Sequence, residues 1–276
     1  MKKIITLFSL FILVLTACKN NKPNSKKKMK GEPICKYLGI DFSHHQGDAN
    51  WKTIDTQTKH RASFFIFRAW RQGDRKDTSF QRNFAEAKKR GFIVGGYQFY
   101  DPNKDPATQT SNYIVFMDSI KLGKGDFRPI FDVELLSDTL LKVMGTITTL
   151  KKDTAQLRIL KMIRVDTVDI LGNLRDTLRK QFVKNIKTCL SILEAKYGVK
   201  PILYANLNFF KENLLESFGF DYPLWIAAYD CDRRSDSVVI NSSIVQFSDK
   251  IKLPGVKGTV DGNDIDCNKL EGLLLK

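Results

Sequence analysis

The chain has 276 residues, 42% of them hydrophobic, which is enough to bury the core of one large α/β domain or of two small ones. Its formal net charge is +15, but the basic residues are scattered along the chain and no nucleic-acid-binding motif accompanies them. The composition therefore argues against a nucleic-acid partner.

The first residues are typical of a secretory signal peptide. Lys2 and Lys3 precede an apolar run over residues 4–15, which is too short to span a membrane. The run ends in Leu-Thr-Ala-Cys at 15–18, and this ending resembles a bacterial lipobox. The resemblance implies a signal peptide over residues 1–17 and lipid attachment to Cys18; an ordinary signal followed by an unrelated cysteine is the alternative. We therefore expect an extracytoplasmic lipoprotein, anchored in a membrane at the periplasmic face or the cell surface.

Residues 18–36 are predicted to link the anchor to the folded domain. They are too polar to build a core, and their lysines would favour an anionic surface. An exported basic protein of this kind would meet an anionic polymer such as a cell wall. Besides Cys18 the chain has Cys35, Cys189, Cys231 and Cys267; they allow three pairings, match no zinc site, and are equally compatible with free thiols.

From residue 37 to residue 276 apolar strands alternate with helices. Strands are predicted at 37–43, 64–69, 92–100, 128–134, 201–205, 223–230 and 243–248, and helices at 80–90, 108–122 and 178–197, with another beginning after Asn50. This order predicts parallel βαβ units, hence an α/β barrel or a doubly wound sheet. Because each short strand carries polar residues at its C-terminal end, a barrel with a site at that face is favoured.

Residues 137–176 interrupt this order directly after the strand at 128–134. The segment is polar and basic, and its partly alternating stretch from Lys161 to Ile170 could form a β-hairpin. We interpret it as an insertion at the rim of the predicted site. It could act as a lid or a substrate wall, or be a loop without a role.

The strand at 128–134 carries two carboxylates at alternate positions. Side chains of a strand point to alternating faces, so Asp132 and Glu134 point to one side and Phe131 and Val133 to the other. Two crowded carboxyls cannot both ionise cheaply, so the pKa of one should rise, and that group can donate a proton at neutral pH. A solvated strand end would give the same pattern.

Several stretches, taken in order, resemble the glycoside hydrolase family 25 lysozymes, the N-acetylmuramidases. They are G-I-D-F-S-H-H-Q-G at 39–47, F-R-A at 67–69, F-x-x-N-x-x-x-A-x-x-x-G-x-x-V-G-x-Y at 80–97, P-I-F-D-V-E at 129–134, P-I-L-Y at 201–204, L-W-I-A-x-Y at 224–229 and D-x-N at 266–268. The resemblance implies a single domain with an irregular (β/α)8-like TIM-type barrel. It also implies cleavage of the β-1,4 bond between N-acetylmuramic acid and N-acetylglucosamine in peptidoglycan, by a monomer without a cofactor.

The family motif carries over to Asp41, Asp132, Glu134 and Asp266 as catalytic acids, with Glu134 as the general acid. The last match is open to a shift, because Asp261 and Asp264 lie close by. We hypothesise that Asp132 orients the 2-acetamido group of the substrate as an internal nucleophile, which gives net retention. No metal site is expected, because His44 and His45 lack a third nearby ligand.

Aromatic and amide side chains near the strand ends are candidate sugar contacts. They are Tyr97, Gln98, Tyr100, Tyr204, Trp225, Tyr229 and Gln246. Core packing is the alternative for each aromatic ring, and it is favoured for Trp225. The sequence departs from the family at Gln98, where a histidine is usual, at Val245, where a tryptophan is usual, and at 70–73, where Trp-Arg-Gln-Gly replaces a Thr-Glu-Gly-like turn.

Two other functions compete with a muramidase. A Ser-His-Asp or Cys-His wall hydrolase would need a nucleophile motif that is absent from the sequence. A non-catalytic peptidoglycan-binding lipoprotein could use the same barrel after losing turnover through the changes at Trp70 and Gln98.

Overall fold

The computed structural model describes residues 35–58, 62–72, 75–152, 167–229 and 235–276. Its strands are β1 (Lys36–Phe42), β2 (Phe64–Arg71), β3 (Arg75–Lys76), β4 (Ile93–Phe99), β5 (Ile130–Asp132), β6 (Ile202–Asn206), β7 (Leu224–Ala227), β8 (Ile244–Ile251) and β9 (Val260–Asp266). The predicted signal peptide, Cys18 and Cys231 lie outside the described residues. Within the described ranges, no helix is both long and apolar enough to cross a membrane.

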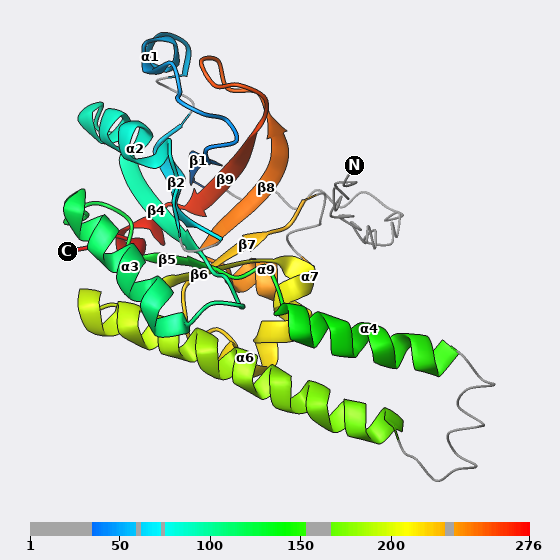
Figure 1. The fold of residues 1–276 in the computed structure, drawn as a ribbon. Helices are drawn as coiled ribbons and strands as arrows, with labels where there is room; N and C mark the ends of the chain where they lie inside the picture. Colours follow the sequence, from blue (N-terminus) through cyan, green and yellow to red (C-terminus); the bar gives the residue numbers. More distant parts are fainter. Residues whose placement is uncertain (1–34, 59–61, 73–74, 153–166, 230–234) are drawn as a thin grey trace, which may run out of the picture. The chain divides into compact units, whose positions relative to one another are not determined.

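Eight of the described strands close into a barrel (Figure 1). The order is β1-β9-β8-β7-β6-β5-β4-β2, and β1 pairs with β2 to complete the ring, while β3 adds to the outer edge of β2. Each neighbouring pair in the series β1-β2-β4-β5-β6-β7-β8 is parallel. The last strand of the ring, β9, runs antiparallel to both β8 and β1. The fold is thus the predicted irregular α/β barrel.

Helices cover the outside of the barrel. They are α1 (Trp51–Thr58), α2 (Phe80–Lys89), α3 (Pro106–Ser119), α4 (Asp138–Lys152), α6 (Thr167–Tyr197), α7 (Leu207–Phe209), α8 (Leu215–Phe218) and α9 (Ser237–Asn241), with a π-helix at Phe210–Leu214 and a 3-10 helix at Leu270–Leu273. As expected, α1 begins after Asn50, whose Oδ1 accepts the Thr53 N–H at 3.2 Å. On β4, Gly96 allows close helix packing, because an added Cβ would lie 2.7 Å from Met117 Cε.

Alternation along each strand divides the core into an inner and an outer layer. On β2, Phe64 and Ile66 join the cluster that fills the barrel, while Phe65 and Phe67 pack under the helices. The same alternation on β5 turns Ile130 inward and Phe131 outward. Consequently Asp132, two residues after Ile130, opens on the inside of the barrel at the C-terminal end of the strand.

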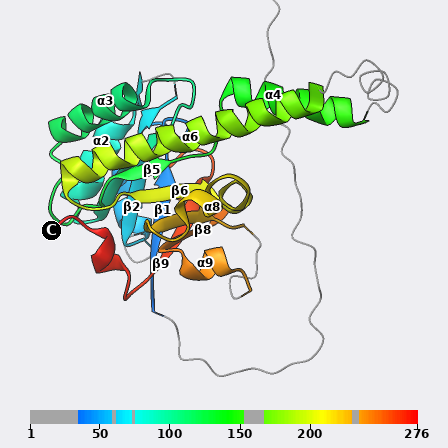
Figure 2. The ribbon, with the colours of Figure 1, turned by 90° about the horizontal axis from the view of Figure 1, so that it is seen from below.

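The predicted insertion is helical where the structure describes it. Thr167–Ile170 form the first turn of α6, so the expectation of a β-hairpin from 161 to 170 is wrong for these four residues, and 161–166 lie outside the described residues. In Figures 1 and 2, α4 lies alongside the N-terminal half of α6, and this pair extends beyond the strands. Ile170 and Leu174 are exposed there, which blurs the helical periodicity and explains why the sequence placed the helix start only at 178.

One disulfide joins the two ends of the described chain. Cys35, just before β1, is bonded to Cys267, just after β9, across a sequence separation of 232 residues. Cys189 on α6 is a buried free thiol. The disulfide therefore ties the first strand of the barrel to the last, at the seam where the ring closes.

Candidate active site

A cavity of about 220 Å³ opens at the C-terminal ends of the parallel strands. It is lined by Asp41, Phe42, Ser43, His45, Gln46, Arg68, Tyr97, Phe99, Asp132, Glu134, Tyr204, Trp225, Gln246 and Asp261. We call this cavity the acidic pocket, because four carboxylates converge in it from β1, β9 and the end of β5. This is the face at which barrel enzymes place their chemistry.

Asp132 and Glu134 enter the acidic pocket side by side. Asp132 is 4% exposed, and its Oδ1 has no hydrogen-bond partner among the described residues. Burial raises the pKa of Asp132 well above its usual value, and the charge of Glu134 raises it further. The pKa of Glu134 is also raised, chiefly by burial, while a hydrogen bond with Tyr204 and the charge of Arg68 oppose the rise. The pair therefore holds a proton at a higher pH than separate carboxyls would.

Asp41 is held in place by two amides. Its Oδ2 accepts hydrogen bonds from Gln246 Nε2 at 2.9 Å and Asn263 Nδ2 at 2.7 Å. Burial and the charge of Asp261 nevertheless raise its pKa well above the usual value. The Oε1 of Gln246 in turn accepts the hydroxyls of Tyr204 at 3.0 Å and Tyr229 at 2.5 Å. Gln246 therefore couples the acid on β1 to tyrosines on and after neighbouring strands.

Arg68 supplies a fixed positive charge beside these acids. Its Nε donates to Asp77 Oδ2 at 3.1 Å, and its guanidinium also contacts His44 Nδ1. Asp77 is buried and accepts the backbone N–H of His44 at 3.1 Å and that of Ser79 at 3.1 Å. These contacts with Asp77 and His44 fix the position of the guanidinium. The positive charge of Arg68 lowers the pKa of both Asp132 and Glu134, against the effect of burial. Arg68 was not among the predicted site residues, although a charged residue inside an apolar strand was a usable signal.

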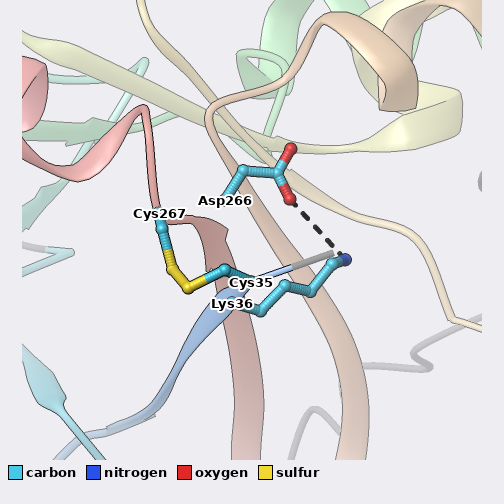
Figure 3. The surroundings of a disulfide bond; sticks show 4 residues. All are labelled: Cys35, Lys36, Asp266 and Cys267. Carbon is cyan, nitrogen blue, oxygen red and sulfur yellow. Dashed lines mark ion pairs between the residues drawn. A yellow bond between two sulfur atoms is a disulfide. The ribbon is translucent and has the colours of Figure 1, made fainter. Parts of the chain in front are cut away.

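Asp266 does not join the other acids, so its predicted place in the site is corrected. The β1–β9 register pairs Asp41 with Asp261 at the pocket end and Lys36 with Asp266 at the opposite end. There Asp266 lies next to the disulfide, 4.0 Å from the ammonium of Lys36 (Figure 3). Asp261 takes its place in the acidic pocket. The alternation of β9 agrees, because Ile265 belongs to the inner cluster, so the odd-numbered residues face the inside.

Asp261 gives a stability prediction with a defined pH window. Burial, followed by the charge of Asp249, raises its pKa from 3.8 to about 6. The folded protein thus binds the proton more tightly than the unfolded chain, and the stability cost grows as the pH rises from about 4 to about 6. We expect Asp261→Asn to stabilise the protein at pH 7 by on the order of 1 kcal/mol, after allowance for solvent screening.

The measurement is thermal unfolding of both proteins at pH 7 and pH 4. At pH 7 the unfolding midpoint of Asp261→Asn should rise by about 2–4 °C per kcal/mol, and at pH 4 the two proteins should agree. Asp266→Asn, on the same strand but outside the acidic pocket, is the matched control and should show no gain. A lower midpoint for Asp261→Asn at pH 7 would contradict the assignment.

Side chains alternate between the two faces of each strand, and this alternation decides which of the predicted sugar contacts line the acidic pocket. Tyr97, Tyr204, Trp225 and Gln246 line the acidic pocket, and Tyr229 reaches it through its hydrogen bond to Gln246. Trp225 is 1% exposed and donates its indole N–H to Asn263 at 2.8 Å, so it supports the wall from within the core.

Gln98 and Tyr100 do not line this pocket, contrary to expectation. Gln98 is buried on the outer side of β4, 3.5 Å from Thr110 of α3. Tyr100 is fully buried against Phe131 and Phe182. Phe99, which lies between them in sequence, is the residue that lines the pocket, and it was not among the predicted contacts.

Comparison with known proteins gives one family. The sequence model of "Glycosyl hydrolases family 25" matches residues 40–256. The uncharacterized protein YegX of Escherichia coli (strain K12) is 24% identical over 227 residues, which is 82% of this chain and 68% of that protein.

Solved structures with similar folds include the following two. One is a family 25 glycosyl hydrolase from Bacillus anthracis, with a TM-score of 0.61 and 21% identity over 86% of this chain and 91% of the other. The second is a bacterial lysozyme from Streptomyces coelicolor, with a TM-score of 0.61 and 18% identity over 86% of this chain and 96% of the other. At these identities the structures show a shared fold.

Proposed function

The chain belongs to the glycosyl hydrolases of family 25, and from this premise we propose that it is a peptidoglycan hydrolase that cuts the β-1,4 bond between N-acetylmuramic acid and N-acetylglucosamine. The observation that carries the proposal is the acidic pocket, in which Asp132 and Glu134 lie together with raised pKa values. Cleavage of a glycosidic bond needs a proton for the leaving oxygen and stabilisation of an oxocarbenium-like centre. The acidic pocket offers groups for both tasks.

Glu134 is the proton donor in this proposal. It is less buried than Asp132 and lies just after β5, at the mouth of the barrel, where a bound glycan chain would lie. Burial raises its pKa, so it keeps its proton to a higher pH than an exposed glutamate. Since only the protonated form can donate, activity should fall as the pH rises through this pKa.

Asp132 is proposed to hold the acetamido group of the sugar at the bond to be cut. Its buried Oδ1 lacks a partner among the described residues and can accept the acetamido N–H. The acetamido carbonyl oxygen then attacks the anomeric carbon while the bond to the leaving oxygen breaks and that oxygen takes the proton of Glu134. This attack closes a five-membered ring that contains the acetamido oxygen and the anomeric carbon. Water, deprotonated by Glu134, then attacks the anomeric carbon and opens that ring. Two displacements give net retention.

Asp41 and Asp261 are proposed to position sugar hydroxyls or the attacking water. Asp41 is fixed by Gln246 and Asn263, so it offers a rigid acceptor at the floor of the acidic pocket. Asp261 lies opposite Asp41 in the strand register. Asp266 has no part in this proposal, because it lies at the other end of β9.

The non-catalytic alternative loses its main support. That alternative rested on the changes at Trp70 and Gln98, and neither residue lines the acidic pocket. Gln98 packs toward α3, and Trp70 packs against Phe116 on the outer side of β2. The four carboxylates of the acidic pocket are independent of both changes.

The proposal extends to location. We propose that the protein is anchored outside the cytoplasm through a lipid on Cys18, so that its barrel reaches peptidoglycan as a monomer. The Cys35–Cys267 disulfide supports an oxidising compartment. Incorporation of labelled palmitate into the wild type but not into Cys18→Ala would support the anchor, and equal labelling of both would contradict it.

The reducing end of the product tests the proposed bond. Purified peptidoglycan is digested, reduced with borohydride and hydrolysed to its sugars. We expect the reduced form of muramic acid in amounts that grow with digestion. Reduced glucosamine would instead identify a glucosaminidase, and amino groups released without reducing ends would identify an amidase or a peptidase.

A further inference from the structure

A second cavity adjoins the acidic pocket. It measures about 460 Å³ and is lined by His44, His45, Arg68, Arg71, Gln72, Arg75, Phe99 and Asp101. His45, Arg68 and Phe99 line both cavities, so the two are neighbours across these side chains. We call the second cavity the arginine pocket, because three arginines line it.

Two of these arginines face one another across a strand pair. Arg71 of β2 is registered opposite Arg75 of β3. The adjacent pair in the ladder, Trp70 and Lys76, lies on the other side, where both contact the ring of Phe116. Like charges placed directly opposite each other in an antiparallel pair are destabilising. An anion between the two guanidiniums would remove that repulsion.

Among the described residues, the arginine pocket has more basic than acidic side chains. Arg68 is paired with Asp77, and Asp101 is the one acid among the described residues that line the pocket. No ion pair joins Arg71 or Arg75 to an acid within the described part of the chain. Toward the described residues both guanidiniums therefore keep donors for an anionic ligand, and their planar forks match a carboxylate.

We propose that the arginine pocket is a subsite for a carboxylate of the peptide stem carried by muramic acid, with Arg71 and Arg75 as its binding residues. This inference rests on the proposed function. In peptidoglycan the stem is attached to the lactyl group of muramic acid, so a sugar in the acidic pocket places its peptide beside that pocket. The arginine pocket is a cationic surface that adjoins the acidic pocket across His45, Arg68 and Phe99.

The test measures binding without turnover. Soluble, uncrosslinked glycan strands that carry peptide stems are titrated into the mature chain bearing Glu134→Gln. Adding Arg71→Ala and Arg75→Ala should weaken binding by about tenfold for each guanidinium removed, a change of about 1.4 kcal/mol apiece. Lys89→Ala with Lys124→Ala also removes two exposed charges, from the end of α2 and the turn before β5, and is the matched control that should bind normally.

Modified strands identify the anion. When the carboxylates are converted to amides with carbodiimide and ammonia, the arginine variant and its parent should bind equally. Strands stripped of peptide by an amidase should also abolish the difference. The proposal is overturned if the arginine variant binds intact strands as tightly as its parent does. It is also overturned if the difference in affinity between the variant and its parent persists on amidated strands or on stripped strands.

The outcome is separable from that of the proposed function. Intact strands that bind in an arginine-dependent way, while the wild-type protein releases no product, would leave the subsite standing and contradict only the hydrolase. Release of product by the wild type with arginine-independent binding would do the reverse.

Discussion

Replacing Glu134 by glutamine is expected to lower the rate of muropeptide release by about 10²–10⁴-fold, the range for loss of a general acid. Glutamine keeps the shape of the side chain but has no proton to give to the leaving oxygen. The measurement is release of soluble muropeptides from purified wall by equal amounts of each protein. Thermal unfolding should show that the variant remains folded.

Two controls separate this role from a structural one. Glu271→Gln changes an exposed glutamate in the 3-10 helix Leu270–Leu273 and should leave the rate unchanged. An aryl glycoside with a good leaving group needs little protonation, so Glu134→Gln should retain much more activity on it than on wall. If release from wall persists undiminished in Glu134→Gln, the general acid is misassigned.

Replacing Asp132 by asparagine should lower the rate by about 10²–10³-fold, because a preorganised electrostatic contact is worth about 3–4 kcal/mol in the transition state. The acetamido group gains positive charge as its carbonyl oxygen attacks, and only a carboxylate balances that charge. The variant should not lose stability, since burial makes the charged form of Asp132 costly, as its raised pKa indicates, and asparagine carries no charge.

The stereochemistry of the product tests the same role. Proton NMR of the first product formed by the wild type should show the β-anomer, because two displacements at the anomeric carbon retain its configuration. Initial formation of the α-anomer would contradict an internal nucleophile. A rate for Asp132→Asn equal to that of the wild type would contradict the proposed contact.

Local pattern favoured a barrel and paired Asp132 with Glu134, while the resemblance to family 25 added Asp41. The apolar strands and their order follow from alternation and from the helices between them. Asp132 and Glu134 share a face through their spacing of two at the end of one strand, and Asp41 is the next-to-last residue of the first strand. These relations lie within single segments, so no register between strands was needed to find them.

The predictions were wrong where the register between strands, or the face of a strand, decides which residues line the acidic pocket. Asp261 and Asp266 both lie on β9, and only the antiparallel pairing with β1 shows which one lies beside Asp41. Gln98 and Tyr100 were predicted together with Tyr97, although even-numbered and odd-numbered side chains of one strand point to opposite faces and cannot line the same cavity. Applying alternation to β4 would have selected Tyr97 and Phe99, as the structure does.

The helices α4 and α6 show a different limit of the sequence. The start of α6 projects past the strands and buries little, so it carries no clear apolar stripe. No described side chain of α4 or α6 lines the acidic pocket. A lid or wall role at that pocket therefore has no support from the described part of the insertion.

The titration of Glu134 tests the central claim most directly. Carbon-13 NMR of protein labelled in its glutamate carboxyls, compared with Glu134→Gln, assigns the resonance of this one group. We predict that it titrates above its usual value of 4.5, because burial favours the protonated form. Titration at or below 4.5 would mean that Glu134 is ionised at neutral pH and would contradict its role as proton donor.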